Sequence, residues 1–297
     1  MPTPQLARRG RVGQGGPVAD GFLGQRVPAA RPSRLEAGRL LAAGLVCGAA
    51  VLLFAVHVRP LAYLPMAAGV ALAWRLDRDL GRDLLLIATG MTIVSTIPLA
   101  ADLSNAGVAR FAVVLSAAVA VPFVLERRVF GGSAIHFPWR AGRPWTRVHW
   151  TYLGAVVLAG YLVLPWYFLS SGVWANWPDL DGPGEIARLF VGVAAVGTWD
   201  ELFFICTVFA LLRRHFALWP ANVLQAVVFV SFLWELGYRS WGPLLTLPFA
   251  LVQGLTFART ASLTYVLTVH LLFDAVVFAV LVHAHHPELF DVFVTAP

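Results

Sequence analysis

The sequence predicts an all-α fold, a bundle of transmembrane helices with about eight or nine spans. Three observations lead to this prediction. Of the 297 residues, 59% are hydrophobic and 13% are charged, which is about half the charged fraction of a soluble domain. The mean hydropathy is +0.73. Apolar stretches close to the roughly 20 residues that a helix needs to cross a hydrocarbon core recur along the chain. These features exclude a soluble globular protein and indicate the lipid bilayer as the environment.

The first 39 residues differ in composition from the rest of the chain. They contain seven of the 22 arginines, only two acidic residues, and many glycines and prolines. Such a segment has too little apolar surface to fold, so we expect residues 1–39 to form a disordered basic tail in the cytoplasm. The net charge of +6 comes from arginine alone, because the chain has no lysine. We expect no nucleic-acid partner, since the arginines lie in this tail and at loop ends.

Nine apolar stretches follow the tail. The second is short and comes directly after the first, so these two are expected to form a tight hairpin, and the number of spans is eight or nine. We interpret 40–170 as N-terminal transmembrane helices and 186–283 as the part that carries the chemistry. The nine stretches lie at about 40–58, 60–74, 84–100, 107–125, 151–170, 186–212, 220–237, 243–258 and 263–283.

The positions of the arginines predict the orientation. With the tail in the cytoplasm and strict alternation of the spans, the arginine-containing loops at 75–82, 126–150 and 213–214 lie inside. The loops at 101–106 and 171–184 then lie outside, and they carry acidic residues but no arginine. This is the positive-inside bias of membrane proteins. The sequence therefore predicts a multi-pass cell-membrane protein whose N-terminus is cytoplasmic.

Ionisable side chains within the spans are the most informative residues. Each costs about 2.5–3.5 kcal/mol at the centre of the bilayer on insertion scales, and such residues usually serve a function. Between 186 and 287, every acidic residue lies in a predicted helix, together with one histidine. We expect these side chains to face inward and to share partners, protons or a metal ion. They are Asp200, Glu201, Glu235, His270 and Asp274.

The spacing of these residues predicts how they meet. His270 and Asp274 are four residues apart and therefore share one face of a helix. Asp200 and Glu201 are adjacent and diverge by about 100° around their helix. One of the two can point into a central cavity while the other braces a neighbouring helix. Glu235 lies one helix and one loop away from each of these pairs.

Three segments resemble the motifs of the CPBP family of intramembrane proteases (CAAX protease and bacteriocin-processing, also called Abi). DELFFIC at 200–206 is similar to the family's EExxxR motif, and FLWELGY at 232–238 lies where the family has FxxxH. QGLTFARTASLTYVLTVHLLFDAVV at 253–277 is similar to the third motif, which ends in HxxxN/D. The order and spacing of the three segments agree with the family over about a third of the chain.

This resemblance implies an endopeptidase built as a helical bundle, which hydrolyses peptide bonds of peptide or protein substrates in or near the membrane. It places Asp200 as the group that activates water and Glu201 as the brace. It places His270 and Asp274 as metal ligands or as groups that bind the oxyanion. Prenylated substrates are not implied, because the family is broad.

The chain departs from the family pattern in its first motif. Asp200 is one methylene shorter than the family's glutamate, and a misplaced catalytic group can cost about a hundredfold in rate. Ile205 occupies the place of the arginine. Glu201 therefore lacks the cation with which the family's second glutamate pairs.

The second motif departs further, because its histidine is absent. Counting four residues from Ser231 places Glu235 at the histidine position, whereas counting from Phe232 places Leu236 there. Both registers remain open from the sequence. What remains across the three motifs is a carboxylate-rich set with one histidine.

A divalent ion would resolve this concentration of negative charge. Glu201, Glu235, His270 and Asp274 are the expected ligands, and their oxygen-rich chemistry favours Zn, Mn or Fe. The ion would lower the pKa of a bound water and polarise the substrate carbonyl, while Asp200 serves as the base. Without an ion, four carboxylates that share a cavity cannot all be ionised.

Three other interpretations stay open. The polar side chains could form a hydrogen-bonded network that only holds helices together. The chain could be a catalytically inactive family member that acts as a membrane adaptor or regulator, as the missing arginine and histidine suggest. It could also be a proton-coupled transporter, although the sequence lacks the paired repeats typical of such carriers.

Overall fold

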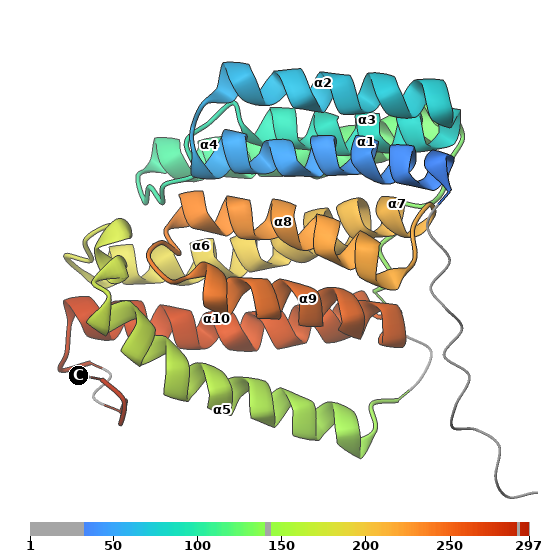
Figure 1. Cartoon of the computed structure of the whole chain (residues 1–297). Helices are drawn as coiled ribbons and strands as arrows, with labels where there is room; N and C mark the ends of the chain where they lie inside the picture. The colour runs from blue at the N-terminus through green and yellow to red at the C-terminus, as the bar shows by residue number, and fades with distance from the viewer. Residues whose placement is uncertain (1–32, 140–143, 290–291, 297) are drawn as a thin grey trace, which may run out of the picture.

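The computed structural model describes residues 33–139, 144–289 and 292–296. Within these ranges the chain consists of helices and the loops between them, and it contains no β-strand. Six of the helices are long and apolar enough to cross a membrane. The predicted all-α, polytopic helical bundle is therefore confirmed (Figure 1).

A helix occupies each of the nine apolar stretches of the sequence. The helices are α1 Arg34–Ala50, α2 Arg59–Leu76, α3 Arg78–Val94, α4 Asn105–Leu125, α5 Arg147–Ser170, α6 Pro183–Asp200, α7 Ala210–Arg213, α8 Leu218–Leu236, α9 Pro243–Thr260 and α10 Leu263–His285. Wider π-helical turns extend three of them, at Val51–Ala55 after α1, at Glu126–Phe130 after α4 and at Glu201–Phe209 between α6 and α7. A short 3-10 turn, Val173–Asn176, follows α5.

The six candidate spans are fewer than the eight or nine expected. Helices α2, α3 and α9 are present where the sequence predicts helices, but α3 has 17 residues. Helices α2 and α9 have 18 residues each and two prolines each, and α2 contains two arginines whereas α9 contains one. Helix α3 is therefore too short, and α2 and α9 are too polar, to be candidate membrane spans by length and composition. They pack against the spans, α2 on α1 and α9 on α8.

The helical part of the chain begins earlier than expected. The Ser33 hydroxyl accepts a hydrogen bond from the Glu36 backbone, and the Glu36 carboxylate accepts one from the Ser33 backbone. This capping box starts α1 at Arg34. Residues 34–39 of the expected disordered tail are thus helical, while its residues 1–32 lie outside the described ranges.

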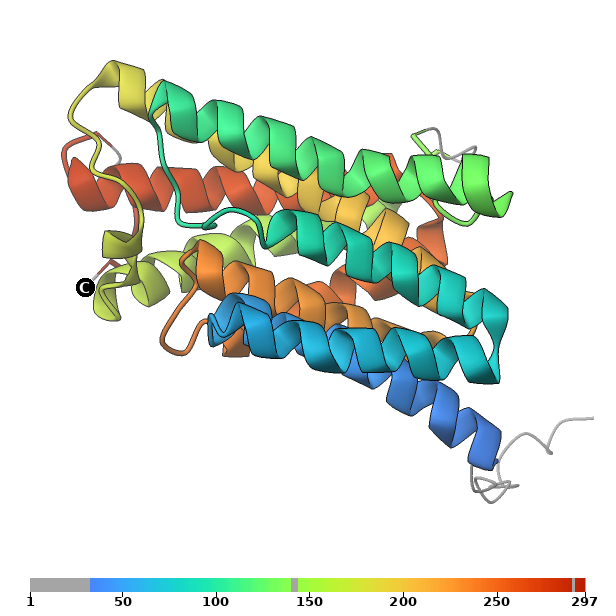
Figure 2. The same ribbon diagram turned by 90° about the horizontal axis from the view of Figure 1, so that it is seen from above.

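The helices form two groups, which Figure 1 shows one above the other. Helices α1 to α4 make one group, and the later helices make the second. Helix α1 packs against α8, and α4 packs against α6 and the π-helical turns that follow it. Seen from above (Figure 2), the long helices run in roughly the same direction or its reverse. Helices α6 and α8 therefore lie at the centre of the bundle.

One end of the bundle gathers charged side chains from distant parts of the sequence. Arg39 pairs with Asp77 at 2.8 Å, and Arg214 and His215 contact Asp83 at 2.9 and 2.7 Å. We call these five residues the basic-end network. It brings the start of α1, the loop between α2 and α3, and the loop after α7 to the same end, which agrees with the expected alternation. The side of the membrane that this end faces stays a prediction.

The acidic pair of the first motif lies inside one long continuous helix. Asp200 is the last residue of α6, and Glu201 begins the π-helical turns. Such turns are frequent at functional sites. Every residue of this π-helical segment except Leu202 is buried. The pair is therefore held by protein on all sides rather than exposed to lipid.

Candidate functional site

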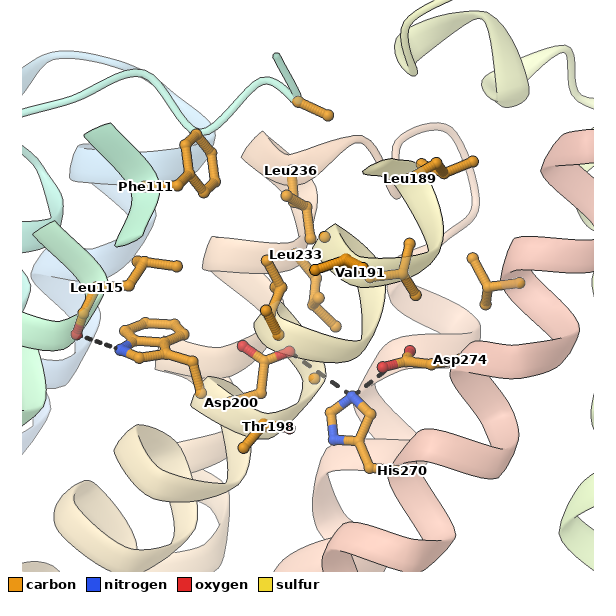
Figure 3. A pocket seen from close by; sticks show the side chains of 18 of the residues that line it. Phe111, Leu115, Leu189, Val191, Thr198, Asp200, Leu233, Leu236, His270 and Asp274 are labelled. Atoms are coloured by element: carbon orange, nitrogen blue, oxygen red, sulfur yellow. Dashed lines mark hydrogen bonds and ion pairs between the residues drawn. The ribbon is translucent and has the colours of Figure 1, made fainter. Parts of the chain in front are cut away.

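A cavity of about 870 Å³ lies between α4, α6, α8, α9 and α10. Asp200, His270 and Asp274 line it, and their exposed fractions are 2%, 4% and 7%. Figure 3 shows these three side chains pointing toward one another, among apolar neighbours such as Leu115 and Leu233. The cavity therefore combines apolar walls with one buried group of carboxylates and an imidazole.

His270 lies at the centre of this group. Its Nε2 atom is 3.7 Å from Asp200 Oδ2 and 3.8 Å from Asp274 Oδ1. Its Nδ1 atom is 2.7 Å from Glu201 Oε1. The predicted common face of His270 and Asp274 on α10 is thus observed, and three carboxyl groups surround one imidazole.

Glu201 orients the His270 ring through its Nδ1 atom. Its Oε1 atom also accepts a hydrogen bond of 2.7 Å from Gln253 Nε2, and Gln253 donates a second one, of 3.1 Å, to the carbonyl of Val266. A carboxylate only accepts hydrogen bonds, so Nδ1–H of His270 donates a hydrogen bond to Glu201 and Nε2 faces the cavity. The adjacent residues Asp200 and Glu201 therefore point in different directions, as their helical spacing predicts.

Three carboxylate oxygens of the group have no partner. The Oδ1 atom of Asp200, Oε2 of Glu201 and Oδ2 of Asp274 are buried, and none makes a hydrogen bond within the described part of the chain. Buried polar atoms are normally paired. The distances of 3.7 and 3.8 Å from His270 Nε2 are also too long for direct hydrogen bonds, and a separation of this kind suits a bridging water. The unpaired oxygens favour a site that binds water or a substrate over a hydrogen-bonded network that only holds helices together.

Gly197 allows this close grouping. It lies on α6, three residues before Asp200. A Cβ atom at this position would overlap Asp274 Oδ2 and approach the His270 ring to 3.3 Å. Only a residue without a side chain lets α6 and α10 approach closely here, which brings Asp200 to the histidine.

Glu235 does not join the group, so its predicted convergence with Asp200 is wrong. The Glu235 Oε1 atom accepts a hydrogen bond of 3.2 Å from the Leu99 backbone. It also lies 3.6 Å from His57 Nε2 and 4.0 Å from the Arg59 guanidinium. Glu235 therefore faces the loops that follow α1 and α3, because it lies on the side of α8 that is turned away from the cavity.

The cavity side of α8 is apolar. Leu233 and Leu236 point into the cavity (Figure 3). Of the two registers of the second motif, the one counted from Phe232 therefore places its last position, Leu236, in the cavity. A leucine there can neither hold a metal nor form a hydrogen bond with a substrate.

The predicted four-ligand metal site is not formed. Glu235 is bonded elsewhere, and Glu201 uses its Oε1 atom for Gln253 and His270. Within the ranges that the structure describes, no three His, Cys, Asp or Glu side chains are placed to hold a metal ion. The side chains therefore do not fit the Zn, Mn or Fe ion expected with Glu201, Glu235, His270 and Asp274 as ligands. The chemistry below is derived from the carboxyl groups and the imidazole.

Two residues of the site were not predicted from the sequence. Gln253 donates to Glu201, and Tyr238 lines the cavity. Gln253 did carry a signal, since it is a buried amide in a largely apolar helix. Tyr238 carried only its position, two residues after Leu236. The role of Gly197 had no sequence signal, because it depends on the approach of α10.

Residues 182–276 match a protein family described as type II CAAX prenyl endopeptidase Rce1-like. This segment is therefore a domain of that family, and the resemblance found in the sequence motifs is confirmed. The matched residues include Asp200, Glu201, Gln253, His270 and Asp274. No curated protein and no solved structure matches the chain.

Proposed function

We propose that this protein is an intramembrane endopeptidase, in which Asp200 activates a water that hydrolyses a peptide bond. One observation carries the proposal: Asp200, His270 and Asp274, all within the Rce1-like segment 182–276, converge on an apolar cavity. Amide hydrolysis needs an activated water, a group that stabilises the oxyanion and a proton donor for the leaving amine. The converging side chains have the chemistry for the first and the third of these needs.

The reaction follows from the placement of the three groups around His270. A water bound between Asp200 Oδ2 and His270 Nε2 loses a proton to Asp200 while its oxygen attacks the carbonyl carbon. His270, protonated on both ring nitrogens, then gives a proton from Nε2 to the nitrogen of the leaving amine, and the proton held by Asp200 passes to Nε2 to restore both groups. Glu201 holds the ring in this orientation through Nδ1, and the charge of Asp274 stabilises the imidazolium. The net change is the addition of one water across the C–N bond.

The cavity also restricts the substrate. Its walls include side chains along most of α4, from Val108 to Phe123, and along α6 from Ala187 to Trp199. An extended apolar group would be buried between these walls with its polar end near Asp200. We therefore propose substrates that carry an apolar side chain or a lipid group next to the cleaved bond and that reach the site from the bilayer.

The replacement Asp200→Asn tests the proposal. The purified protein in liposomes is given a panel of peptides, prenylated and unprenylated, and cleavage is followed by mass spectrometry. Loss of a general base lowers the rate by about a hundredfold or more, so Asp200→Asn should cleave at least that much more slowly than the wild type. Its thermal unfolding should change little, because Asp200 Oδ1 has no hydrogen-bond partner and Oδ2 lies 3.7 Å from His270 Nε2, too far for a direct hydrogen bond.

The matched control is Asp79→Asn, an exposed aspartate on α3 whose carboxylate, among the residues that the structure describes, pairs with Arg82 on the same helix. It should cleave as the wild type does. If Asp200→Asn cleaves the panel at the wild-type rate, the role of Asp200 as the base is wrong, and if the wild type cleaves no member of the panel, the proposed endopeptidase is wrong.

A second candidate is a non-catalytic family member that binds membrane proteins without cleaving them. Leu236 in the cavity, at the place of the family's histidine, favours it. This candidate predicts that the wild type binds members of the panel and cleaves none, with affinities that Asp200→Asn leaves unchanged.

A further inference from the structure

The proposed hydrolysis has one need that the three converging residues do not meet. The carbonyl oxygen becomes negatively charged when water attacks, and a hydrogen-bond donor aimed at it usually contributes much of the catalysis. Leu236 contributes only an aliphatic side chain to the cavity. The donor must therefore come from another part of the wall.

Tyr238 lies two residues after Leu236 and lines the same cavity as Asp200 and His270. It is 8% exposed. The backbone turns sharply after α8 at Gly237, whose φ of 139° is a conformation that favours glycine. The Tyr238 backbone then donates a hydrogen bond of 3.0 Å to the carbonyl of Leu233. The end of α8 thus directs an aromatic side chain back toward the site.

Neighbouring residues hold this ring in place. The rings of Trp177 and Phe168 meet it edge to face, with centroids 5.3 and 5.7 Å away. Asn176 donates a hydrogen bond of 3.0 Å to the carbonyl of Gly237. Edge-to-face contacts of this kind stabilise a defined ring orientation, so the position of the Tyr238 hydroxyl is set before a substrate arrives.

The hydroxyl itself is free to act. A buried tyrosine hydroxyl usually finds a partner, as that of Tyr167 does by donating to the carbonyl of Arg239 at 2.7 Å. The Tyr238 hydroxyl makes no hydrogen bond to any residue that the structure describes. Burial raises the pKa of Tyr238 well above its usual value, and the negative charges of Asp274 and Asp200 raise it further. The phenol therefore keeps its proton and remains a donor.

We propose that the Tyr238 hydroxyl binds the carbonyl oxygen of the scissile bond and stabilises the oxyanion, a role that Leu236 cannot fill. This inference rests on the proposed endopeptidase function. When water attacks, the π electrons of the C=O bond move to the oxygen, and Tyr238 donates a hydrogen bond to it. When the C–N bond breaks, the C=O bond forms again and the leaving nitrogen takes its proton from His270. Tyr238 keeps its own proton throughout.

The replacement Tyr238→Phe tests this role, because it keeps the ring and its aromatic contacts and removes only the hydroxyl. The peptide panel in liposomes gives kcat and KM, and thermal unfolding is measured on the same preparations. Loss of one oxyanion donor lowers kcat by about 10²–10³-fold. We expect that loss in Tyr238→Phe, with KM within about threefold of the wild type, because the donor acts on the transition state.

The matched control is Tyr63→Phe on α2, which removes a hydroxyl bonded to Ser95 at 2.9 Å and outside the cavity. It should leave kcat unchanged. If Tyr238→Phe keeps the wild-type kcat while Asp200→Asn is inactive, the role of Tyr238 is overturned and the endopeptidase stands. If the wild type cleaves no member of the panel, the endopeptidase itself is overturned. A lower kcat in Tyr238→Phe that comes with a lower unfolding temperature would also overturn the inference, because the hydroxyl would then act through the fold.

Discussion

The candidate site and the basic-end network are both clusters in which a buried aspartate meets a histidine, yet their charges are arranged differently. In the network, Arg39 and Arg214 face Asp77 and Asp83, so that each carboxylate has a cation. In the site, three carboxyl groups surround His270 alone. The first arrangement balances its charges and stabilises the fold. The second leaves carboxylate oxygens available for chemistry.

The two histidines show the same contrast. In the network, Arg39 donates to Nδ1 of His215 at 3.3 Å, and a guanidinium has no acceptor, so Nε2–H must be the donor to Asp83. Both nitrogens of His215 are therefore used by neighbours. In the site, Glu201 holds one nitrogen of His270 and the other faces the cavity. A ring held by one nitrogen is oriented and can still exchange a proton.

The largest effect on stability is expected for Asp83→Asn in the basic-end network, and it distinguishes a structural cluster from a functional one. Asp83→Asn removes an acceptor from Arg214 and His215 and leaves the Arg214 guanidinium and the Nε2–H of His215 facing an amide. Breaking a buried pair costs about 3–5 kcal/mol. Because the Arg214 side chain is 42% exposed, we expect a loss near the lower end, about 3 kcal/mol in the free energy of unfolding in detergent. The cleavage rate of the folded fraction should stay that of the wild type.

The control for this comparison is again Asp79→Asn, on the same helix as Asp83, where a surface pair contributes less than about 1 kcal/mol. Asp200→Asn should show the reverse pattern to Asp83→Asn, with cleavage lost and stability kept. If Asp83→Asn abolishes cleavage in protein that remains folded, the assignment of a purely structural role to the network fails.

A smaller effect is expected for Gln253, which contacts the site through Glu201. Gln253→Leu removes a donor to Glu201 and leaves this buried carboxylate with His270 as its remaining partner. We expect a loss of about 1–2 kcal/mol in unfolding free energy and about a tenfold lower kcat, because partners that orient a functional histidine commonly affect activity on this scale.

Gln225→Leu is the matched control for that replacement. Gln225 is also fully buried, and it donates to Asn222 and to the carbonyl of Ala250 between α8 and α9. It should lose similar stability and no activity. Equal losses of kcat in both variants would contradict the bracing role of Gln253.

The smallest effect is expected at Glu235. In Glu235→Gln the amide oxygen can still accept the hydrogen bond from the Leu99 backbone, and only the charge facing His57 and Arg59 is lost. Both of these partners are more than a third exposed, so we expect a change below about 1 kcal/mol and cleavage within about twofold of the wild type. Cleavage reduced as strongly as in Asp200→Asn would restore the interpretation of Glu235 as a catalytic residue.

The placement of Glu235 shows where inference from the sequence reached its limit. Insertion cost identifies a buried carboxylate as important, but it does not say which neighbour it meets. Glu235 and Leu236 are adjacent on α8 and face different sides. A shift of one residue in a helix turns a side chain by about 100°, so the register of the second motif could not be decided from spacing alone.

The residues around His270 were predicted more completely, because their relations are local. The four-residue separation of His270 and Asp274 and the adjacency of Asp200 and Glu201 fix relative directions on single helices. No local sequence pattern identified the partner of Glu201. With Ile205 in place of an arginine, that partner comes from α9, as Gln253.

The sequence by itself therefore determined the membrane-embedded helical class, the helices, the family resemblance over about 186–283 and the three carboxyl side chains around His270. Each of these depends on composition, on periodicity or on residues close together in the chain. Only the tertiary structure decided that Glu235 lies apart, that Leu236 and Tyr238 face the cavity, and that Gly197 lets α6 meet α10. Those outcomes depend on how helices that are distant in the chain pack against one another, and packing is set by the shapes of both surfaces at once.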